Sequence, residues 1–260
     1  TRKNQLEAIP NAKGFYWNPR QNEIDHNCFE GVDILIHLAG ASISQRWTKK
    51  NKKEILDSRV KGTNLLVNAI QQLNGKHQLI QVVAASAIGI YPSSFSAVYT
   101  EDYSPQPDSF LEEVVIAWEK AEDGFASLGL KLCKLRIGLV MTATGGVLGT
   151  LKIPTWFGLG AAFGNGQQTQ SWIHVDDLCA GICTIYDNFD SMLIQYPVVD
   201  IGTGHAYPVS EVARLMGYDG EYVKVAPRGE RTVTKANIEP LLKFGWTPKR
   251  NIINEAGDYK

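Results

Sequence analysis

Three short apolar runs, separated by helix-like stretches, constrain the fold of this chain most strongly. The runs span residues 32–38, 79–85 and 131–137 and are rich in branched side chains, which is typical of strands buried on both faces of a parallel sheet. Between them, apolar residues recur at helical spacing over 49–72 and 110–128. Strands that alternate with helices imply right-handed parallel crossovers, so we predict an α/β fold with a doubly wound parallel sheet.

Each of the three runs is followed by a small residue or glycine. The pairs of residues after the runs are Ala39-Gly40, Ser86-Ala87 and Gly138-Leu139. In a doubly wound sheet, ligands bind beyond the carboxyl ends of the strands, and small residues let a ligand approach the backbone. Small residues also permit a tight turn, and a tight turn explains the small residues after any one strand equally well. Because three exits share the feature, we predict a ligand crevice at this edge of the sheet.

The composition argues against several classes of partner. The 26 Lys and Arg residues nearly balance the 27 Asp and Glu residues, so charge favours neither nucleic acid nor an anionic membrane surface. No apolar run approaches the roughly 18 to 20 residues that a membrane span needs, and the four cysteines form no metal-binding pattern. We therefore expect a cytoplasmic protein that binds a small molecule and no nucleic acid, membrane or metal, with a homodimer left open.

Seven motifs, spread over about residues 1–187, match one protein family. They are IHLAGASI at 36–43, Arg46-Trp47, SRVKGT at 58–63, SAIGIY at 86–91, WEKA at 118–121, LRIG at 135–138 and SWIHVDD at 171–177. Their combination resembles the sugar nucleotide epimerase-like branch of the atypical or extended short-chain dehydrogenases/reductases. The resemblance implies a Rossmann-like nucleotide-binding sheet and an NAD(P) cofactor.

The C-terminal part is similar to the tail of nucleotide-sugar epimerases and dehydratases. It carries DIGTG at 200–204, Arg228 before Gly229-Glu230, and FGWTP at 244–248. This similarity implies a small substrate lobe in which Arg228 holds the pyrophosphate of a nucleotide sugar, because a guanidinium fork suits phosphate geometry. A solvated surface arginine is the alternative.

The two resemblances together predict a division into domains. We expect residues 1–140 and 173–203 to form the Rossmann-like nucleotide-binding domain, N-terminally incomplete, and residues 141–172 and 204–260 to form the small substrate-binding lobe.

The start of the sequence departs from the family pattern. Family members open with a strand, a glycine-rich turn, a helix and a second strand, and we expect this chain to start just past that second strand. The turn supplies backbone amides to the cofactor pyrophosphate, so either the sequence is partial or cofactor binding is lost. Arg2 matches the position that the resemblance assigns to the adenosine 2′-phosphate, which favours NADP over NAD; a solvated arginine is the alternative.

The resemblance assigns cofactor contacts to strand ends and neighbouring helices. Besides Arg2, the expected contacts are Leu38, Ala39, Gly40, Arg59, Ala84, Ala85, Ile137 and His174. His174 precedes a helix that begins with two acids, so a purely architectural role is its alternative. Substrate contacts are expected from Arg46 and Trp47, although core packing explains Trp47 equally well.

The proton relay of the short-chain dehydrogenases is absent. The relay needs a Tyr and a Lys four residues apart on one helix face, so that Lys lowers the pKa of Tyr. Here Val115 and Glu119 stand at those positions. The remaining catalytic candidates are Ser86, Tyr91 and Glu119, with Glu119 as a general base or as a structural ion-pair partner.

Two functions remain in competition. The first is an NADP-dependent epimerase-like or dehydratase-like oxidoreductase or isomerase that acts on a nucleotide sugar or a related hydroxylated substrate. The second is a non-catalytic NADP-binding sensor or scaffold, which the missing relay favours.

Overall fold

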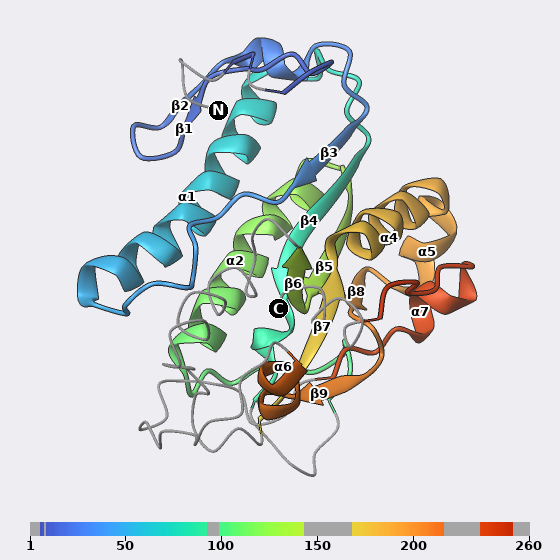
Figure 1. The fold of residues 1–260 in the computed structure, drawn as a ribbon. Coiled ribbons are helices and arrows are strands. Elements are labelled where there is room, and N and C mark those ends of the chain that lie inside the picture. Colours follow the sequence, from blue (N-terminus) through green and yellow to red (C-terminus); the bar gives the residue numbers. More distant parts are fainter. Residues whose placement is uncertain (1–5, 8, 93–98, 143–167, 216–234, 252–260) are drawn as a thin grey trace. The chain divides into compact units, whose positions relative to one another are not determined.

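The structure is a computed structural model that describes residues 6–7, 9–92, 99–142, 168–215 and 235–251. Figure 1 shows the helices and strands as a ribbon. The chain divides into two compact units. The first unit comprises Thr1–Ala85 with Val114–Lys134, and the second comprises Ser86–Glu113 with Leu135–Lys260.

The first unit contains a parallel sheet covered by two long helices. In register, Ile34 of β3 lies opposite Gln81 of β4, and His37 lies opposite Ala84. The full strand order of this sheet is β3-β4-β5-β8, in which β4 and β5 run on into the second unit. The elements are β1 (Trp17–Asn18), β2 (Glu23–Ile24), η2 (His26–Phe29), β3 (Ile34–His37), α1 (Lys49–Gln72), β4 (Gln81–Ala87), α2 (Phe110–Ser127) and β5 (Lys131–Ile137).

One apolar cluster holds α1 and α2 against the strands. Leu66 and Ile70 of α1 meet Val82 of β4, Phe125 of α2 and Leu132 of β5. Each of these side chains is almost entirely removed from water, and burial of a Leu or Phe side chain contributes roughly 1.5–3 kcal/mol. The helical spacing seen in the sequence therefore marks the face of α1 that packs on the sheet.

Local signals set the ends of α1 and explain the glycine within it. The Thr48 side chain caps the helix by accepting a hydrogen bond from the Asn51 amide, and Asn74 and Gly75 adopt positive φ just after its end. A Cβ at Gly62 would lie 3.3 Å from the Trp17 ring. Gly62 thus makes room for the indole that packs across the middle of the helix.

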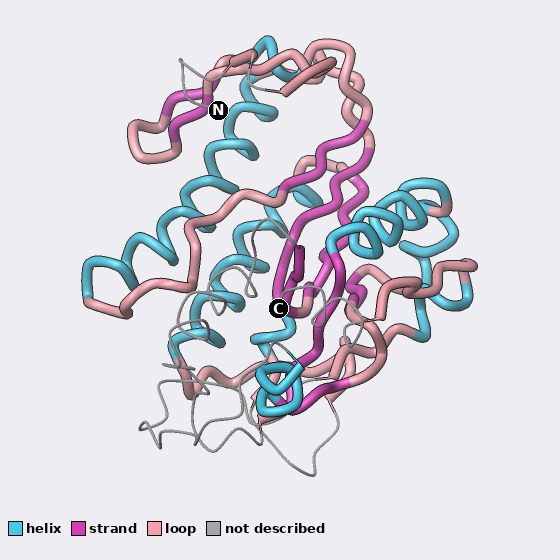
Figure 2. Tube along the Cα trace, viewed as in Figure 1, coloured by secondary structure: helices cyan, strands magenta, loops and turns pink. Residues whose placement is uncertain are grey.

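The second unit contains a three-stranded mixed sheet with order β6-β7-β9 (Figure 2). Leu139 of β6 lies opposite Trp172 of β7 in parallel register, and Ser171 of β7 lies opposite Ala206 of β9 in antiparallel register. The elements that begin in this unit are η3 (Ile88–Ile90), β6 (Leu139–Thr142), β7 (Thr169–His174), α4 (Val175–Asp187), α5 (Phe189–Gln195), β8 (Val198–Ile201), β9 (Ala206–Pro208), α6 (Val209–Leu215) and α7 (Glu239–Lys243).

The structure confirms the α/β class and corrects several boundaries. The predicted helix at 49–72 and the predicted strand at 131–137 form with those bounds. Ser86 and Ala87, which were expected to follow the second run, are the last two residues of β4. Two strands that the sequence did not predict, β6 and β7, lie at the two boundaries of the segment 141–172 that was assigned to the substrate lobe.

The predicted domain division stays a prediction. Its small substrate lobe, residues 141–172 and 204–260, lies in large part outside the described residues. Among the described residues, no helix is both long and apolar enough to cross a bilayer, and no group of three His, Cys, Asp or Glu side chains is arranged to hold a metal ion.

Candidate functional site

The carboxyl end of β3 is an open strand end in the first unit. Leu38 is 53% exposed, Ala39 is half-buried and Gly40 is exposed. The chain then turns toward α1, where the Ala41 amide donates a 2.9 Å hydrogen bond to the Ser58 hydroxyl. The backbone at Gly40 is therefore accessible to a ligand and is held in place by the adjoining helix.

Arg59 of α1 is packed against this strand end. Its Nη1 donates hydrogen bonds of 3.1 Å to the carbonyl oxygens of Ala41 and Ile55. Its Cζ lies 4.9 Å from the centroid of the Trp118 ring, and a Cβ at Gly40 would lie only 3.1 Å from that Cζ. The guanidinium thus lies between the Gly40 backbone and the indole. We call Gly40, Arg59 and Trp118 the arginine clamp.

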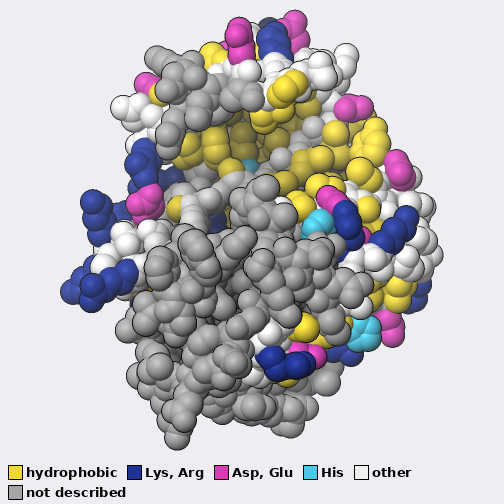
Figure 3. Space-filling model, in the orientation of Figure 1, with side chains coloured by type: hydrophobic (Ala, Val, Ile, Leu, Met, Phe, Trp, Pro, Cys, Tyr) yellow, Lys and Arg dark blue, Asp and Glu magenta, His cyan; other side chains and the backbone are white. Residues whose placement is uncertain are grey.

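The charge of Arg59 has no acidic partner among the described residues. No described carboxylate lies within 4.0 Å of its guanidinium nitrogens, and partial burial lowers its pKa. Burial of a cation without an anion costs free energy even when the hydrogen bonds are partly satisfied. Lys and Arg side chains also gather over the start of α1 (Figure 3), which adds positive potential on this unit.

Behind the strand end lies a buried histidine, His37. It is 3% exposed, its Nε2 lies 3.2 Å from the Thr63 hydroxyl, and its ring meets Trp17 edge-on. Burial lowers its pKa to about 4. His37 is therefore neutral at physiological pH and supports the strand end from within.

Helix α2 carries three buried glutamates, Glu112, Glu119 and Glu122. Val115 and Glu119, at the positions of the missing relay, are 4% and 8% exposed. Glu122, one turn after Glu119, is fully buried, and neither of its carboxyl oxygens has a hydrogen-bond partner in the part of the chain that the structure describes. Burial, and then Glu119, raise the pKa of Glu122 to about 9. Sequence reasoning missed Glu122, although its position four residues after Trp118 places it on the core face of α2.

The second unit holds the catalytic candidates Ser86 and Tyr91. Ser86 is 3% exposed. The Tyr91 hydroxyl donates to Asp200 Oδ1 at 3.0 Å and accepts from Arg136 Nη1 at 2.8 Å, and Arg136 also donates to the Glu101 carbonyl oxygen at 3.2 Å. Tyr91 therefore belongs to a buried polar network that joins segments distant in the sequence.

The surroundings of this network shift two pKa values. Burial, and then Asp200, raise the pKa of Tyr91 well above its ordinary value. Burial, and then Glu101, raise the pKa of Asp200 to about 7. The Tyr91 hydroxyl consequently stays protonated across the physiological range.

The small residues predicted to follow the three strands differ in their exposure to solvent. Gly40 is exposed, whereas Ser86 is buried within β4. Gly138 is half-buried, and a Cβ there would lie 2.7 Å from the Ser171 carbonyl oxygen of β7. Close packing against β7 explains the glycine at 138, and the arginine clamp accounts for the glycine at 40.

His174 and its neighbours build the start of α4. His174 Nδ1 accepts a hydrogen bond of 3.2 Å from the Asp176 amide and so caps the helix. The buried Asp177 carboxylate accepts hydrogen bonds from the amides of Lys249 and Arg250. Both acids therefore have structural partners within this unit.

The remaining predicted residues lie apart from the clamp contacts. Arg46 is exposed, and the Trp47 indole donates to the Ile43 carbonyl oxygen at 3.0 Å. Ala84 and Ala85 are buried in β4, and Ile137 is the half-buried last residue of β5. Arg2, predicted to bind the 2′-phosphate, and Arg228, predicted to bind the nucleotide-sugar pyrophosphate, lie outside the described residues.

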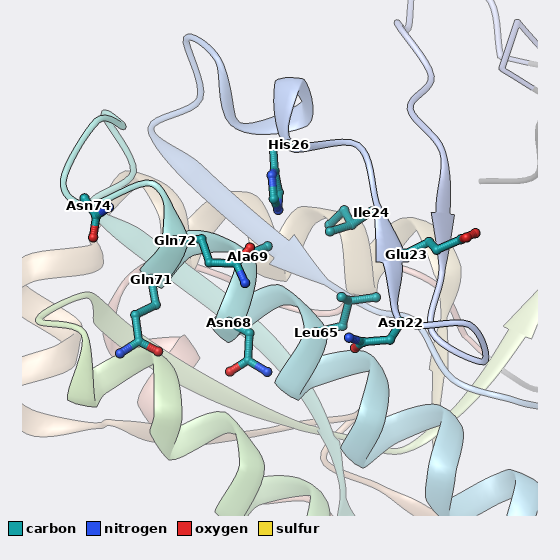
Figure 4. A pocket seen from close by; sticks show the side chains of 10 residues that line it. All are labelled: Asn22, Glu23, Ile24, His26, Leu65, Asn68, Ala69, Gln71, Gln72 and Asn74. Carbon is teal, nitrogen blue, oxygen red and sulfur yellow. The ribbon is translucent and has the colours of Figure 1, made fainter.

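A separate cavity of about 620 Å³ lies near the other end of α1 (Figure 4). None of the residues predicted for the site lines it, and many of its side chains are exposed amides. Because α1 runs antiparallel to the strands, its last turn lies toward their amino ends, where doubly wound sheets do not bind ligands. The lining residues are Asn22, Glu23, Ile24, His26, Leu65, Asn68, Ala69, Gln71, Gln72 and Asn74.

Comparison with known proteins gives a family for most of the chain. No protein-family model matches the sequence. An epimerase family protein of Staphylococcus saprophyticus is 39% identical over 178 residues, which are 68% of this chain and 58% of that protein. A second, from Staphylococcus haemolyticus, is 35% identical over 187 residues, which are 72% of this chain and 59% of that protein. The chain thus spans about three fifths of the length of these relatives. Over the matched region, it belongs to the epimerase-like family of extended short-chain dehydrogenases/reductases.

Solved structures share the fold at low sequence identity. A dTDP-glucose 4,6-dehydratase from Streptomyces venezuelae, solved with NAD, has a TM-score of 0.77 at 20% identity, covering 98% of this chain and 80% of its own. A human epimerase family protein solved with NADPH has a TM-score of 0.70 at 21% identity, covering 88% and 83%. These likenesses confirm the predicted Rossmann-like fold.

Proposed function

We propose that this protein binds a nicotinamide dinucleotide at the carboxyl ends of its parallel strands. We propose further that it acts as an NAD(P)-dependent epimerase-like oxidoreductase or isomerase on a nucleotide sugar or a related hydroxylated substrate. The observation that carries the proposal is the 39% identity with an epimerase family protein. The shared fold supports it, because structures with this fold were solved with NADPH or NAD.

The end of β3 fits part of such a cofactor. The backbone of Gly40 is exposed, and Arg59 offers a cation that no described carboxylate neutralises. A dinucleotide brings a pyrophosphate of opposite charge, and Leu38 and Ala39 would line its path. The bound nicotinamide would supply the hydride acceptor or donor. NADP is the proposed form, on the role that the family resemblance gives to Arg2.

The proposed catalytic groups differ in what they can do. Glu119 is buried beside Glu122, which fits a general base shielded from bulk water. The Tyr91 hydroxyl already bonds to Asp200 and Arg136, so we assign Tyr91 a positioning role at the proposed substrate site near Ser86. Arg46, Trp47 and Arg228 remain the proposed substrate contacts.

A panel of nucleotide sugars tests the proposed activity. Each sugar is incubated with the protein and NADP or NAD, and products are identified by NMR. We expect an epimerised or dehydrated product with NADP, and a loss of at least tenfold in rate for Glu119→Gln relative to the exposed control Lys120→Gln. A protein that binds NADP but exchanges no hydride with any substrate of the panel would contradict the enzymatic proposal.

A second candidate function is a non-catalytic NADP-binding sensor or scaffold. The observation that favours it is the buried Val115 at the position of the relay tyrosine, with Glu119 at that of the lysine. Under this reading, NADP raises the melting temperature and changes binding to a protein partner without turnover. Hydride exchange with any substrate would exclude it.

A further inference from the structure

We propose that the cavity between α1 and the segment of β2 and η2 is a second ligand site, which binds a neutral, hydroxyl-rich molecule such as an unphosphorylated sugar (Figure 4). Its volume of about 620 Å³ lies within the roughly 300–1,000 Å³ that is usual for small-molecule sites. Because the cavity lies away from the strand ends at which this fold binds a dinucleotide, its ligand is additional to the cofactor and the substrate. The proposal therefore does not depend on the proposed function.

The first support is a set of side-chain amides that line the cavity. Asn68, Gln71 and Gln72 stand at i, i+3 and i+4, so they share one side of α1. Asn74 follows the helix, and Asn22 lines the cavity from the turn before β2. All five side chains are exposed, and none makes a hydrogen bond to another residue in the described part of the chain. An amide both donates and accepts hydrogen bonds, as a hydroxyl group does, so these side chains suit a ligand with several hydroxyls.

The second support is the absence of charge from this half of α1. Lys, Arg, Asp and Glu are frequent from Lys49 to Lys61, whereas none occurs between Lys61 and Lys76. Over that second stretch, the exposed side chains are all amides. The exposed face of a helix ordinarily carries charged as well as polar residues. A face made of amides can be covered by a neutral polar ligand without the cost of burying a charge.

The third support is an apolar floor beneath the amides. Leu65 and Ala69 of α1 line the cavity and are 5% and 1% exposed, and the half-buried Ile24 lines it from β2. A sugar ring carries C–H groups beside its hydroxyls. Contact between those C–H groups and this floor removes apolar surface from water while the amides bind the hydroxyls. The cavity therefore matches both parts of a sugar ring.

The charged groups at the cavity select against a phosphate. Neither Lys nor Arg is among the described residues that line it. Glu23 lines it, and its Oε2 accepts a hydrogen bond of 2.9 Å from the Tyr16 hydroxyl. A phosphorylated sugar would bring negative charge toward Glu23 without a Lys or Arg side chain to bind it. The ligand class is therefore the unphosphorylated sugar, in contrast to the dinucleotide proposed for the end of β3.

The experiment measures sugar binding by saturation-transfer NMR and calorimetry. The probes are methyl glucoside, methyl galactoside, N-acetylglucosamine and maltose, each at millimolar concentration. The variant Asn68→Ala/Gln72→Ala removes two amides from the cavity, and the control Asn64→Ala removes an exposed amide one turn earlier that does not line it. We expect the wild type and the control to bind at least one of the four sugars with equal affinity, and the double variant to bind it at least tenfold more weakly.

A charge-matched probe tests the class of the ligand. Glucose 1-phosphate should bind several-fold more weakly than methyl glucoside, and Glu23→Gln should reduce that difference. Equal or tighter binding of the phosphate would contradict a site for neutral sugars.

The proposal is overturned if the wild type binds none of the four sugars, or if the double variant binds them as well as the wild type does. The replaced side chains are exposed, so the double variant should keep the melting temperature of the wild type. If it does not fold, Gln72→Ala alone decides: a several-fold loss supports the proposal, and an unchanged affinity overturns it. NADPH binding, measured on the same proteins, should not differ between the double variant and the wild type. A protein that binds a sugar but no NADPH contradicts the proposed function and leaves the sugar site supported.

Discussion

Arg59 in the first unit and Arg136 in the second have similar aromatic neighbours but opposite electrostatic surroundings. The Arg59 guanidinium lies 4.9 Å from the Trp118 ring, and that of Arg136 lies 5.2 Å from the Tyr91 ring. Arg136 is 3% exposed, bonds to the Tyr91 hydroxyl and opposes the rise in the pKa of Asp200 that burial causes. Arg59 bonds only to backbone carbonyl oxygens among the described residues.

The difference separates a structural cation from one available to a ligand. A buried charge is tolerated when hydrogen bonds and an opposite charge compensate it, and removing one partner is then strongly destabilising. Arg136 donates to the Tyr91 hydroxyl, which in turn donates to Asp200, so hydrogen bonds link this cation to an acid within its own unit. Among the residues that the structure describes, the Arg59 guanidinium has no acidic partner, and its Nη2 and Nε donate no hydrogen bond. Loss of Arg136 should therefore affect stability, and loss of Arg59 should affect ligand binding.

The largest expected effect is that of Arg136→Met. It leaves the Asp200 carboxylate and the Tyr91 hydroxyl buried without their cation, so we expect the free energy of unfolding to fall by about 3–5 kcal/mol. Urea denaturation measures the change. The paired variant Arg136→Met/Asp200→Asn should recover part of the loss. A decrease in the free energy of unfolding of less than about 1 kcal/mol would contradict a structural role for Arg136.

The next effect concerns Glu122, an acid of the first unit that lacks a partner. The pKa of Glu122 is about 9 in the folded protein, above its ordinary value of 4.5. As pH rises from 4.5 to 9, Glu122 therefore ionises in the unfolded chain before it ionises in the folded protein, and the free energy of unfolding falls. Glu122→Gln cannot ionise, and we expect it to exceed the wild type in stability by on the order of 2 kcal/mol at pH 8. Urea denaturation from pH 5 to pH 9 should give a flatter profile for Glu122→Gln than for the exposed control Glu113→Gln. Equal slopes would show that Glu122 ionises normally in the folded protein.

A smaller effect on stability is expected for Arg59→Met. The variant loses two hydrogen bonds to backbone but also removes the cost of an uncompensated cation, so the free energy of unfolding should change by about 1 kcal/mol or less. The same denaturation assay used for Arg136→Met measures it. Destabilisation as large as that of Arg136→Met would make Arg59 a structural cation and would abolish the distinction between the two arginines.

The smallest effect on stability is expected for Gly40→Ala, which leaves every charge in place. The added methyl would lie 3.1 Å from Arg59 Cζ, and Gly40 does not adopt a positive φ. We expect the guanidinium to shift by a few tenths of an ångström, with a several-fold loss of diphosphate affinity and a change in stability of about 0.5 kcal/mol. Calorimetry on Gly40→Ala and on Gly89→Ala, where a Cβ meets nothing within 4 Å, distinguishes the clamp from a general effect of added bulk.

Local patterns were sufficient to predict the regular elements. Residues 49–72 form one helix because apolar side chains recur on one face and Thr48 caps the start. Strands β6 and β7 escaped prediction because they flank a glycine-rich stretch. The register of β7 depends on β6 and β9, which are distant in the sequence.

The site was predictable in part only. The glycine at position 40 indicates the end of a strand. The packing of Arg59 against Gly40, however, depends on how the connection between β3 and α1 brings the helix back to the strand end. The partner of the Tyr91 hydroxyl, Asp200, lies 109 residues away and could not be read from local sequence. Burial of Glu122 likewise follows from how α2 packs against the sheet, not from its charge.

The most direct test of the central claim, that the end of β3 binds a nicotinamide dinucleotide with Arg59 on its phosphate, is a crystal structure of the protein with NADPH. We expect the dinucleotide to pass the Gly40 backbone and a phosphate oxygen to lie within hydrogen-bond distance of Arg59 Nη2 or Nε. A dinucleotide bound away from the end of β3, or one whose phosphates leave Arg59 bonded only to Ala41 and Ile55, would contradict it.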